Sequence, residues 1–150
     1  MPTISKCASI VYRFGHMFFD EHLEENHIGS GQQFFLLHIY EHPGISQEEL
    51  AHIDHYDKGT TARAVKKLEQ EGYILRKSDE RDRRFMKLYV TKEGEALVFK
   101  IQKIIKQWNE MLSAGLEEEE KILVSKLIEK IAHNAQQYGK QKRLEESLYE

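Results

Sequence analysis

Hydrogen-bonding and cationic side chains gather in the middle of the sequence, where their types and spacing suit contact with DNA. One group follows Asp57 and would occupy the first turns of a helix, and a second group lies further along in a polar turn. Side chains of these types bond to base edges and to phosphates in the grooves of a duplex. The candidate DNA-binding residues are Lys58, Gly59, Thr60, Thr61, Arg63, Lys66, Lys67, Arg81, Arg83 and Arg84.

The two groups suit different parts of a duplex. The residues at the start of the helix would reach base edges in a major groove, and Lys66 and Lys67 would contact the flanking backbone. Gly59 weakens the helix by up to about 1 kcal/mol relative to alanine, but it would let the backbone approach a phosphate closely. The arginines of the turn would enter a minor groove, with Asp82 bracing one guanidinium through a bidentate pair.

The distribution of charge agrees with this interpretation. The chain of 150 residues has a formal net charge of −3. Residues 57–94 nevertheless contain eleven basic and seven acidic side chains, whereas residues 1–56 contain two basic and eight acidic ones. A local basic segment is typical of a surface that contacts phosphate, although similar charges also occur on solvated helix faces. The charge alone leaves both interpretations open.

The elements that must position these residues are mostly helices. Apolar residues recur at spacings of three and four along the first segment and along the two long segments near the end, as in amphipathic helices. Ser46 and Glu49 form a capping-box pattern, Asp57 can cap the next helix, and Gly72 can end it. Two strand-like runs flank a charged turn, which predicts a β-hairpin. The predicted helices are 4–26, 32–42, 47–53, 58–71, 92–114 and 116–138, and the predicted strands are 73–77 and 85–90.

Three short segments complete this prediction. Residues 29–31 separate the first two helices, residues 54–56 make a tight connection, and the charged residues 139–150 are expected to fray. A short helix, a tight turn, a second helix and a hairpin follow one another in the order of a winged helix-turn-helix. We therefore expect a mostly α fold with a small β-hairpin wing (α+β), in which a winged helix-turn-helix core is flanked by long helices at both ends.

The composition excludes several classes of protein. The chain is 40% hydrophobic and has only two prolines, which is enough apolar material for a core. Its single cysteine, Cys7, cannot form an intrachain disulfide. No apolar run approaches the roughly 20 residues that span a bilayer, and the first residues lack the pattern of a signal peptide, so we expect a cytoplasmic protein with no membrane partner. The usual catalytic and phosphate-binding motifs are absent, so we expect neither an enzyme nor a bound cofactor.

Taken together, these motifs resemble the MarR family of bacterial and archaeal transcription regulators. Residues 57–74 are similar to the family's recognition helix and to the glycine-aromatic-aliphatic entry to its wing. Asp82, Arg83 and Arg84 match the wing, and the pattern from Thr91 to Gly94 matches the start of the next helix. Thr61 departs from the family pattern, in which an aliphatic residue is more usual.

The resemblance implies one subunit over residues 1–150 that binds double-stranded DNA as a homodimer. Residues 1–30 and 92–150 would form the dimerisation helices, and residues 32–91 the winged helix-turn-helix. Two-fold symmetry would set the recognition helices about 34 Å apart on a pseudo-palindromic operator. The apolar stripes at both ends favour association independently, because so small a chain has few other places to bury them. Repression is the commoner role among similar proteins, and we adopt it as the expectation.

Many similar proteins release DNA when a small aromatic acid binds between the dimerisation helices and the winged module. Arg13 and Lys6 are the only cations in residues 1–56, so Arg13 is a candidate to receive the carboxylate of an aromatic or anionic effector. Alternatively, Arg13 pairs with a glutamate at the surface. The other candidate pocket residues are Tyr12, His16, Phe19, Phe35, His38 and Trp108.

Three other functions are alternatives. Eight histidines suggest a metal-responsive regulator, but the helix predicted at 92–114 has none, and zinc-sensing relatives use histidines there. Cys7 suggests a redox-responsive one, but the tyrosines of peroxide-sensing relatives are missing from the start of the second helix, so we expect a buried and unreactive thiol. The third alternative is a protein-interaction module, for which the arginines around Asp82 are less suited than for DNA.

Overall fold

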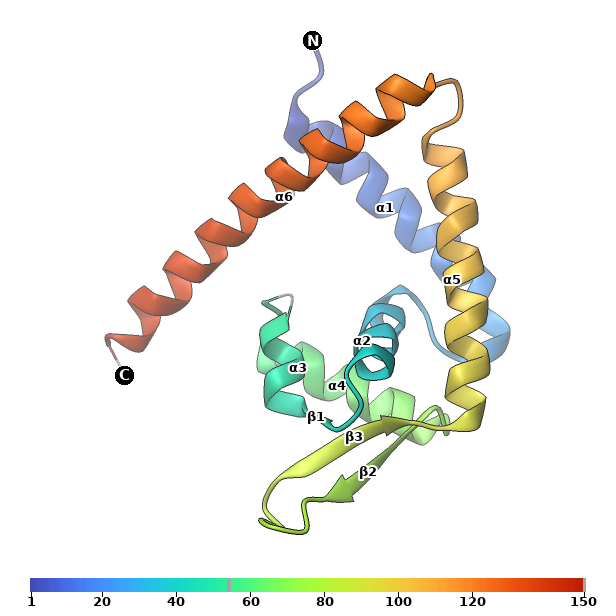
Figure 1. The fold of residues 1–150 in the computed structure, drawn as a ribbon. Helices are drawn as coiled ribbons and strands as arrows, with labels where there is room; N and C mark the ends of the chain where they lie inside the picture. The colour runs from blue at the N-terminus through green and yellow to red at the C-terminus, as the bar shows by residue number, and fades with distance from the viewer. Residues whose placement is uncertain (54, 150) are drawn as a thin grey trace. The chain divides into compact units, whose positions relative to one another are not determined.

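Helices make up most of the chain, and a small antiparallel sheet accompanies them (Figure 1). The computed structural model describes residues 1–53 and 55–149, in two units, residues 1–109 and 110–150, that are described separately below. The elements are α1 (Ile4–Leu23), η1 (Glu24–Asn26), α2 (Ser30–Glu41), β1 (Ile45–Ser46), α3 (Gln47–Ile53), α4 (Lys58–Gln70), β2 (Ile74–Ser78), β3 (Met86–Val90), α5 (Lys92–Leu112) and α6 (Glu118–Ser147). The predicted winged helix fold is confirmed.

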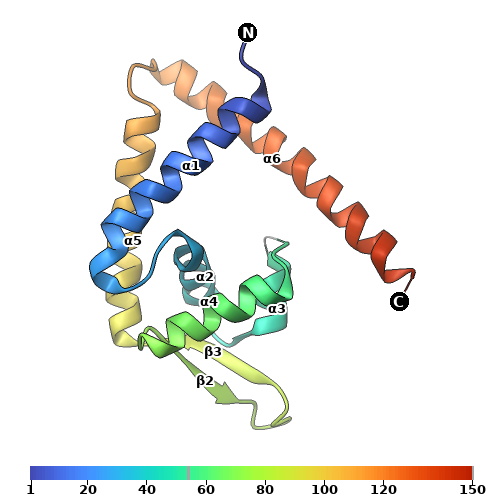
Figure 2. The same ribbon diagram turned by 180° about the vertical axis from the view of Figure 1, so that it is seen from behind.

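The core of the first unit forms around α2, whose sequence is apolar almost all round. This helix packs against α1, α3, α4 and β3, and Figures 1 and 2 show it in the middle of that unit. Leu36 and Ile39 of α2, Leu68 of α4, Leu88 of β3 and Ile101 of α5 are each fully buried. Helix α4 and the hairpin, which carry the predicted DNA-binding residues, are therefore attached to one continuous core.

The start of α2 differs from the prediction. The glycines at residues 29–31 were expected to break the chain up to Gln32, but α2 begins at Ser30. The Gly29 amide donates to Gln32 Oε1 at 2.9 Å, and the Ser30 amide donates to Asp20 Oδ1 at 2.8 Å. Because two side-chain oxygens satisfy the first free amides, the helix extends by two residues despite its glycine.

The sheet contains one strand that the sequence analysis missed. β3 pairs antiparallel with both neighbours in the order β1-β3-β2, and Ile45 of β1 lies opposite Leu88. A strand of two residues has no periodicity to detect. The hairpin strands lie within one residue of the prediction, with Ile74 opposite Val90 and Ser78 opposite Met86. This register leaves residues 79–85 as the tip of the wing.

The capping predictions around α3 are confirmed. The Glu49 amide donates to Ser46 Oγ at 3.1 Å, and the Ser46 amide donates to Glu49 Oε2 at 2.9 Å. These reciprocal bonds satisfy two otherwise free donors at the start of α3. The tight connection predicted at residues 54–56 falls partly outside the described residues, which omit residue 54.

A close approach fixes the start of α5 against the turn that leads into the hairpin. The Thr91 hydroxyl donates to the Gly72 carbonyl at 2.7 Å and accepts from the Gly94 amide at 3.1 Å, and the Thr91 amide donates to the Tyr73 carbonyl at 3.0 Å. Gly72 itself has a φ of +79°, in the left-handed region that favours glycine. A Cβ on Gly94 would collide with the Tyr73 carbonyl oxygen. The pattern from Thr91 to Gly94 is therefore a packing requirement.

The last helix is longer than predicted. Residues 139–150 were expected to fray, but α6 continues to Ser147. Its final turns are rich in good helix formers and contain intrahelical pairs such as Lys142 with Glu145 at 3.5 Å. None of its residues is buried, and its apolar side chains, including Ile122, Leu123, Leu127 and Ile128, are exposed. In the part of the chain that the structure describes, none of the helices combines the length and the apolar composition of a membrane span.

Replacing Gly94 with alanine tests the close approach at the start of α5. The added methyl group would meet the Tyr73 carbonyl and lie 2.7 Å from Val90 Cγ1, so Gly94→Ala should lower the free energy of unfolding by about 1–3 kcal/mol. Gly139→Ala is the matched control, because its Cβ would meet nothing within 4 Å. Urea denaturation followed by circular dichroism measures both variants. Equal stability of the two would show that the contact does not constrain the fold.

Candidate nucleic-acid interface

Asp57 fixes the start of α4, the helix predicted to contact DNA. Its Oδ1 accepts from the Thr60 amide at 2.7 Å, and its Oδ2 accepts from the Thr60 hydroxyl at 2.5 Å. These hydrogen bonds, first from the hydroxyl and then from the amide, hold the pKa of Asp57 below its ordinary value. The carboxylate is therefore ionised at neutral pH, where it caps the helix and complements the positive end of the helix dipole.

The exposed face of α4 carries several of the predicted contact residues. Lys58, Gly59, Arg63 and Lys66 are exposed, and residues 59, 63 and 66 recur at helical spacing on one side. The Arg63 Nη2 donates to Thr60 Oγ1 at 3.2 Å, so the hydroxyl network at the start of the helix also orients this arginine. This face presents cations and an uncovered stretch of backbone at Gly59.

Two predicted residues of α4 do not belong to this face. Thr61 is fully buried, and its hydroxyl donates to the Asp57 carbonyl at 3.0 Å. The prediction that Thr61 faces DNA is therefore wrong. Lys67 pairs with Glu71 at 3.4 Å and lines a cavity with Asp20, Glu21 and Glu24. Its ammonium is therefore directed toward acidic neighbours.

The tip of the wing is ordered by two aspartates. The Arg81 amide donates to Asp79 Oδ1 at 2.8 Å, and the Arg84 amide donates to Asp82 Oδ1 at 3.1 Å. Each aspartate thus bonds to the backbone two residues further on, the geometry of an Asx turn. The hairpin closes above these turns, where the Asp79 amide donates to the Phe85 carbonyl at 2.8 Å. The tip therefore has a defined shape in the free protein.

Asp82 also forms the predicted bidentate pair. The Arg84 Nε donates to Oδ1 at 3.1 Å, and Nη2 donates to Oδ2 at 3.0 Å. The hydrogen bond from the Arg84 side chain is the main cause that lowers the pKa of Asp82. The Arg84 side chain remains 88% exposed, so its guanidinium is fixed in direction but still accessible. Arg81 and Arg83 are exposed, and neither side chain forms a hydrogen bond or ion pair with the residues that the structure describes.

The wing holds further cations that the sequence analysis did not single out. Arg76 donates to Glu69 Oε2 at 2.9 Å, and Lys87 pairs with Asp79 at 3.5 Å, so both are engaged within the fold. Lys77 is exposed, with its Nζ 5.4 Å from the centre of the Tyr89 ring. The sequence does place Lys77 in the basic segment next to the polar turn, and this position could have identified it as a candidate. Lys77 is an additional candidate for phosphate contact.

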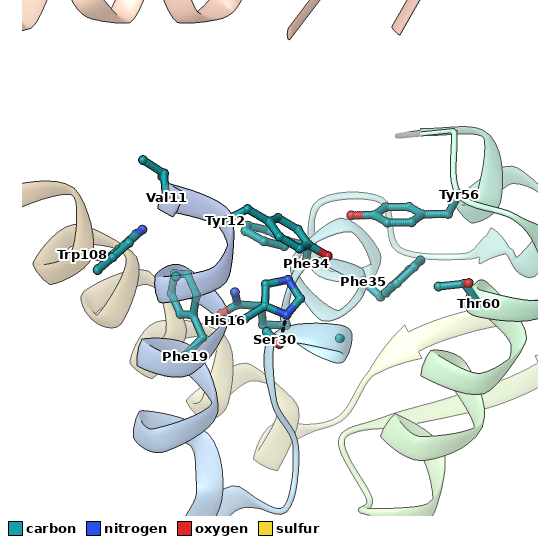
Figure 3. Close-up of a pocket in the computed structure, with 13 residues that line it drawn as sticks. Val11, Tyr12, His16, Phe19, Ser30, Phe34, Phe35, Tyr56, Thr60 and Trp108 are labelled. Carbon is teal, nitrogen blue, oxygen red and sulfur yellow. Dashed lines mark hydrogen bonds between the residues drawn. The ribbon is translucent and has the colours of Figure 1, made fainter. Parts of the chain in front are cut away.

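A second candidate site is a cavity of about 340 Å³ in the same unit (Figure 3). It contains five of the predicted effector residues, namely Tyr12, His16, Phe19, Phe35 and Trp108. The prediction that Arg13 and His38 face this cavity is wrong, since neither lines it. Arg13 is exposed, and its Nε donates to the Ser9 carbonyl at 3.4 Å on its own helix. The helix that carries Arg13 turns its side chain outward.

Polar groups in the cavity come from three helices. His16 Nδ1 of α1 lies 3.0 Å from Ser30 Oγ at the start of α2, as the dashed line in Figure 3 shows. Thr60, in the first turn of α4, is at the edge of the cavity, so the cavity extends to the helix that carries the candidate DNA contacts. Gln33 of α2 also lines the cavity, and the sequence analysis gave it no role.

The alternatives of a redox-responsive and a metal-responsive regulator depend on Cys7 and on clusters of metal-binding side chains. Cys7 is exposed, as are the other residues in the first half of α1, so the expectation of a buried thiol is wrong. Among the described residues, no group of three or more histidine, cysteine, aspartate or glutamate side chains is arranged to hold a metal ion.

Comparison with known proteins agrees with this architecture. The sequence model of the MarR family matches residues 30–85. The HTH-type transcriptional regulator BilQ of Clostridium symbiosum is 35% identical over 115 residues, which cover 77% of this chain and 80% of that protein. The crystal structure of a MarR transcriptional regulator from Methanosarcina mazei Go1 is 36% identical, covers 90% of this chain and 97% of its own, and superposes with a TM-score of 0.83.

A structure that contains DNA is also similar. A MarR family transcriptional regulator from Listeria monocytogenes, described as putative and solved with a 26mer DNA, is 26% identical, with a TM-score of 0.83 and coverage of 93% of both chains. The fold is thus shared with proteins that regulate transcription. The chain belongs to the MarR family of DNA-binding transcriptional regulators.

Proposed function

We propose that this protein is a homodimeric repressor that recognises a pseudo-palindromic operator and is released by a small-molecule effector. The observation that carries the DNA-binding part is the pairing of an exposed, cation-bearing face on α4 with a wing tip whose arginines are ordered by Asp79 and Asp82. The Listeria relative that was solved with DNA supports it. Repression is proposed because it is the commoner role in the family.

The contacts on each half-site follow from which side chains are accessible. Lys58, Gly59, Thr60, Arg63 and Lys66 would contact base edges and phosphates in the major groove. Arg81, Arg83 and Arg84 would enter the adjacent minor groove, where a narrow groove concentrates negative potential. Thr61 is left out of this set because it is buried, and Lys67 because it is paired with Glu71.

The homodimer is proposed because helices at both ends of the chain expose apolar side chains. In α1 they include Ile4, Val11, Phe14 and Met17, and in α6 they include Leu123, Leu127 and Ile128. A monomer in water would leave these groups solvated, and a second copy of the chain can bury them. A two-fold dimer would also match a palindromic operator.

Effector release is proposed through the cavity beside α4. Its volume of about 340 Å³ and its mostly aromatic walls suit a small planar molecule. Thr60 is the connection to DNA binding, because its hydroxyl bonds to Asp57 and accepts from Arg63 while its residue borders the cavity. A ligand that displaces Thr60 would therefore alter both the helix cap and the direction of Arg63.

Selection of bound sequences from random duplex DNA tests the proposed function directly. Purified protein at moderate salt should enrich an inverted repeat whose half-sites lie one helical turn apart. If no sequence is enriched and binding is weak and salt-sensitive, the proposal of an operator-specific regulator fails and the interaction-module alternative gains.

The contribution of Arg83 can be measured on the selected operator. Arg83→Ala should weaken binding by about 1–3 kcal/mol per half-site and should reduce the slope of log affinity against log salt by about two, since each subunit of the dimer loses one cation that neutralises phosphate charge. Lys106→Ala removes an exposed charge outside the winged module and serves as the control. Fluorescence anisotropy of labelled operator at several salt concentrations measures both. If the two variants weaken binding equally, the loss reflects the general charge of the protein, and Arg83 makes no specific contact with the operator.

Replacing Asp82 tests whether its carboxylate matters by directing the Arg84 guanidinium or by its negative charge near the DNA. Asp82→Ala removes a negative charge near the phosphates but also releases the Arg84 guanidinium, so it should weaken operator binding by about 1 kcal/mol. Glu80→Ala removes the same charge from an exposed neighbour, and it should leave affinity unchanged or raise it. Anisotropy titrations of the two variants decide the matter, because tighter binding by Asp82→Ala would mean that the pair does not position the wing.

The proposed dimer depends on the apolar face of α6. Leu127→Glu should convert the protein from dimer to monomer at micromolar concentration, because a carboxylate would have to be buried in the interface. Lys140→Glu changes an exposed residue on the opposite side of the same helix and should remain dimeric. Light scattering coupled to gel filtration gives the two masses. A dimeric Leu127→Glu protein would remove this face of α6 from the interface.

A further inference from the structure

The side chain of Gln33 lacks hydrogen-bond partners in a closed environment. Gln33 is 0% exposed, and neither its Nε2 nor its Oε1 bonds to any of the residues that the structure describes. Thr61, the other fully buried polar residue, is satisfied by the Asp57 carbonyl. Burying an amide without a partner is unfavourable, so such a group in a native protein calls for an explanation, and the binding of a ligand that pairs with it is one. Gln33 lines the cavity, so that cavity is where a partner can enter.

The rest of the cavity wall indicates which ligands it can accept. Most of its surface is apolar, and aromatic side chains that include Tyr12, Phe19, Phe35 and Trp108 contribute to it (Figure 3). No lysine, arginine, aspartate or glutamate is among the lining residues that the structure describes. His16 and Ser30 already bond to each other at 3.0 Å. Because an ionised carboxylate would be buried there without a lysine or arginine to pair with it, the cavity favours a neutral ligand.

A carboxamide that presents both a donor and an acceptor is complementary to a second amide held in the cis arrangement. We propose that this cavity binds a neutral, planar aromatic lactam, which pairs through its N–H and C=O with the Gln33 carboxamide. Because Gln33 is closed off from solvent in this structure, binding includes a rotation of its side chain toward the cavity. The inference names the chemical class of the effector, and its regulatory meaning rests on the proposed function.

Three bicyclic probes with a common skeleton test this class. Carbostyril is a neutral lactam, quinoline has a ring acceptor without an N–H donor, and quinaldate carries a carboxylate. Calorimetric titration of each probe into the full chain, without DNA, gives the affinities. Trp108 is the only tryptophan in the sequence and lines the cavity, so its emission reports whether a probe binds there.

Variants of Gln33 isolate the role of its carboxamide. Gln33→Met keeps the length of the side chain and removes both polar atoms, and Gln33→Leu provides a second apolar replacement if the first does not fold. Gln102→Leu, at an exposed position of α5, is the matched control. We expect Gln33→Met to weaken carbostyril binding by about tenfold or more and to leave quinoline binding nearly unchanged. Gln102→Leu should bind carbostyril as the unmodified chain does.

Several results would overturn the inference. They are failure of carbostyril to bind, tighter binding of quinaldate than of carbostyril, and equal carbostyril binding by the unmodified chain and Gln33→Met. The proposed function is tested separately by adding carbostyril to the complex with the selected operator. If carbostyril binds in a Gln33-dependent manner but leaves operator affinity unchanged, the ligand class is supported and effector release through this cavity fails.

Discussion

The contact between the start of α5 and the turn after α4 is the constraint on which the winged unit depends. Thr91 bonds to the backbone of Gly72, Tyr73 and Gly94, and the absence of a side chain at Gly94 lets the two segments meet. The helix that carries the candidate DNA contacts, the hairpin and α5 are joined at this one place. The direction in which the wing leaves the core is therefore set by backbone packing, independently of the charged residues at its tip.

Local signals in the sequence predicted the parts of the fold that local interactions determine. Ser46 with Glu49, Asp57 with Thr60, and Asp82 with Arg84 are each formed by residues two or three positions apart, and all three are present in the structure. The errors arose where the partner is distant in sequence. α2 starts early because Asp20 reaches its first turn, and β1 exists because β3 lies beside it. Neither of these contacts, between Asp20 and α2 or between β1 and β3, can be predicted from a single sequence.

In the candidate sites, too, local features could be predicted from the sequence and features that depend on distant residues could not. Spacing and residue type identified the exposed cations of α4 and the wing, but they did not determine which side of α4 faces the core, so Thr61 was assigned to the wrong face. Arg13 was chosen as an anion receiver because it is a rare cation in its segment, and rarity does not determine direction. Gln33 had no sequence signal at all, since an unsatisfied amide becomes visible only when its surroundings are known.

The pairing of Arg84 with Asp82 has a consequence for how the wing would tolerate variation in an operator. Arg84 is held in one direction before DNA arrives, so it loses little side-chain freedom on binding, whereas Arg81 and Arg83 retain theirs. A fixed guanidinium suits one groove geometry, and mobile ones adapt to several. The wing therefore combines one arginine of fixed direction, Arg84, with two mobile ones, Arg81 and Arg83. This combination would keep the protein in register on operators whose outer base pairs differ.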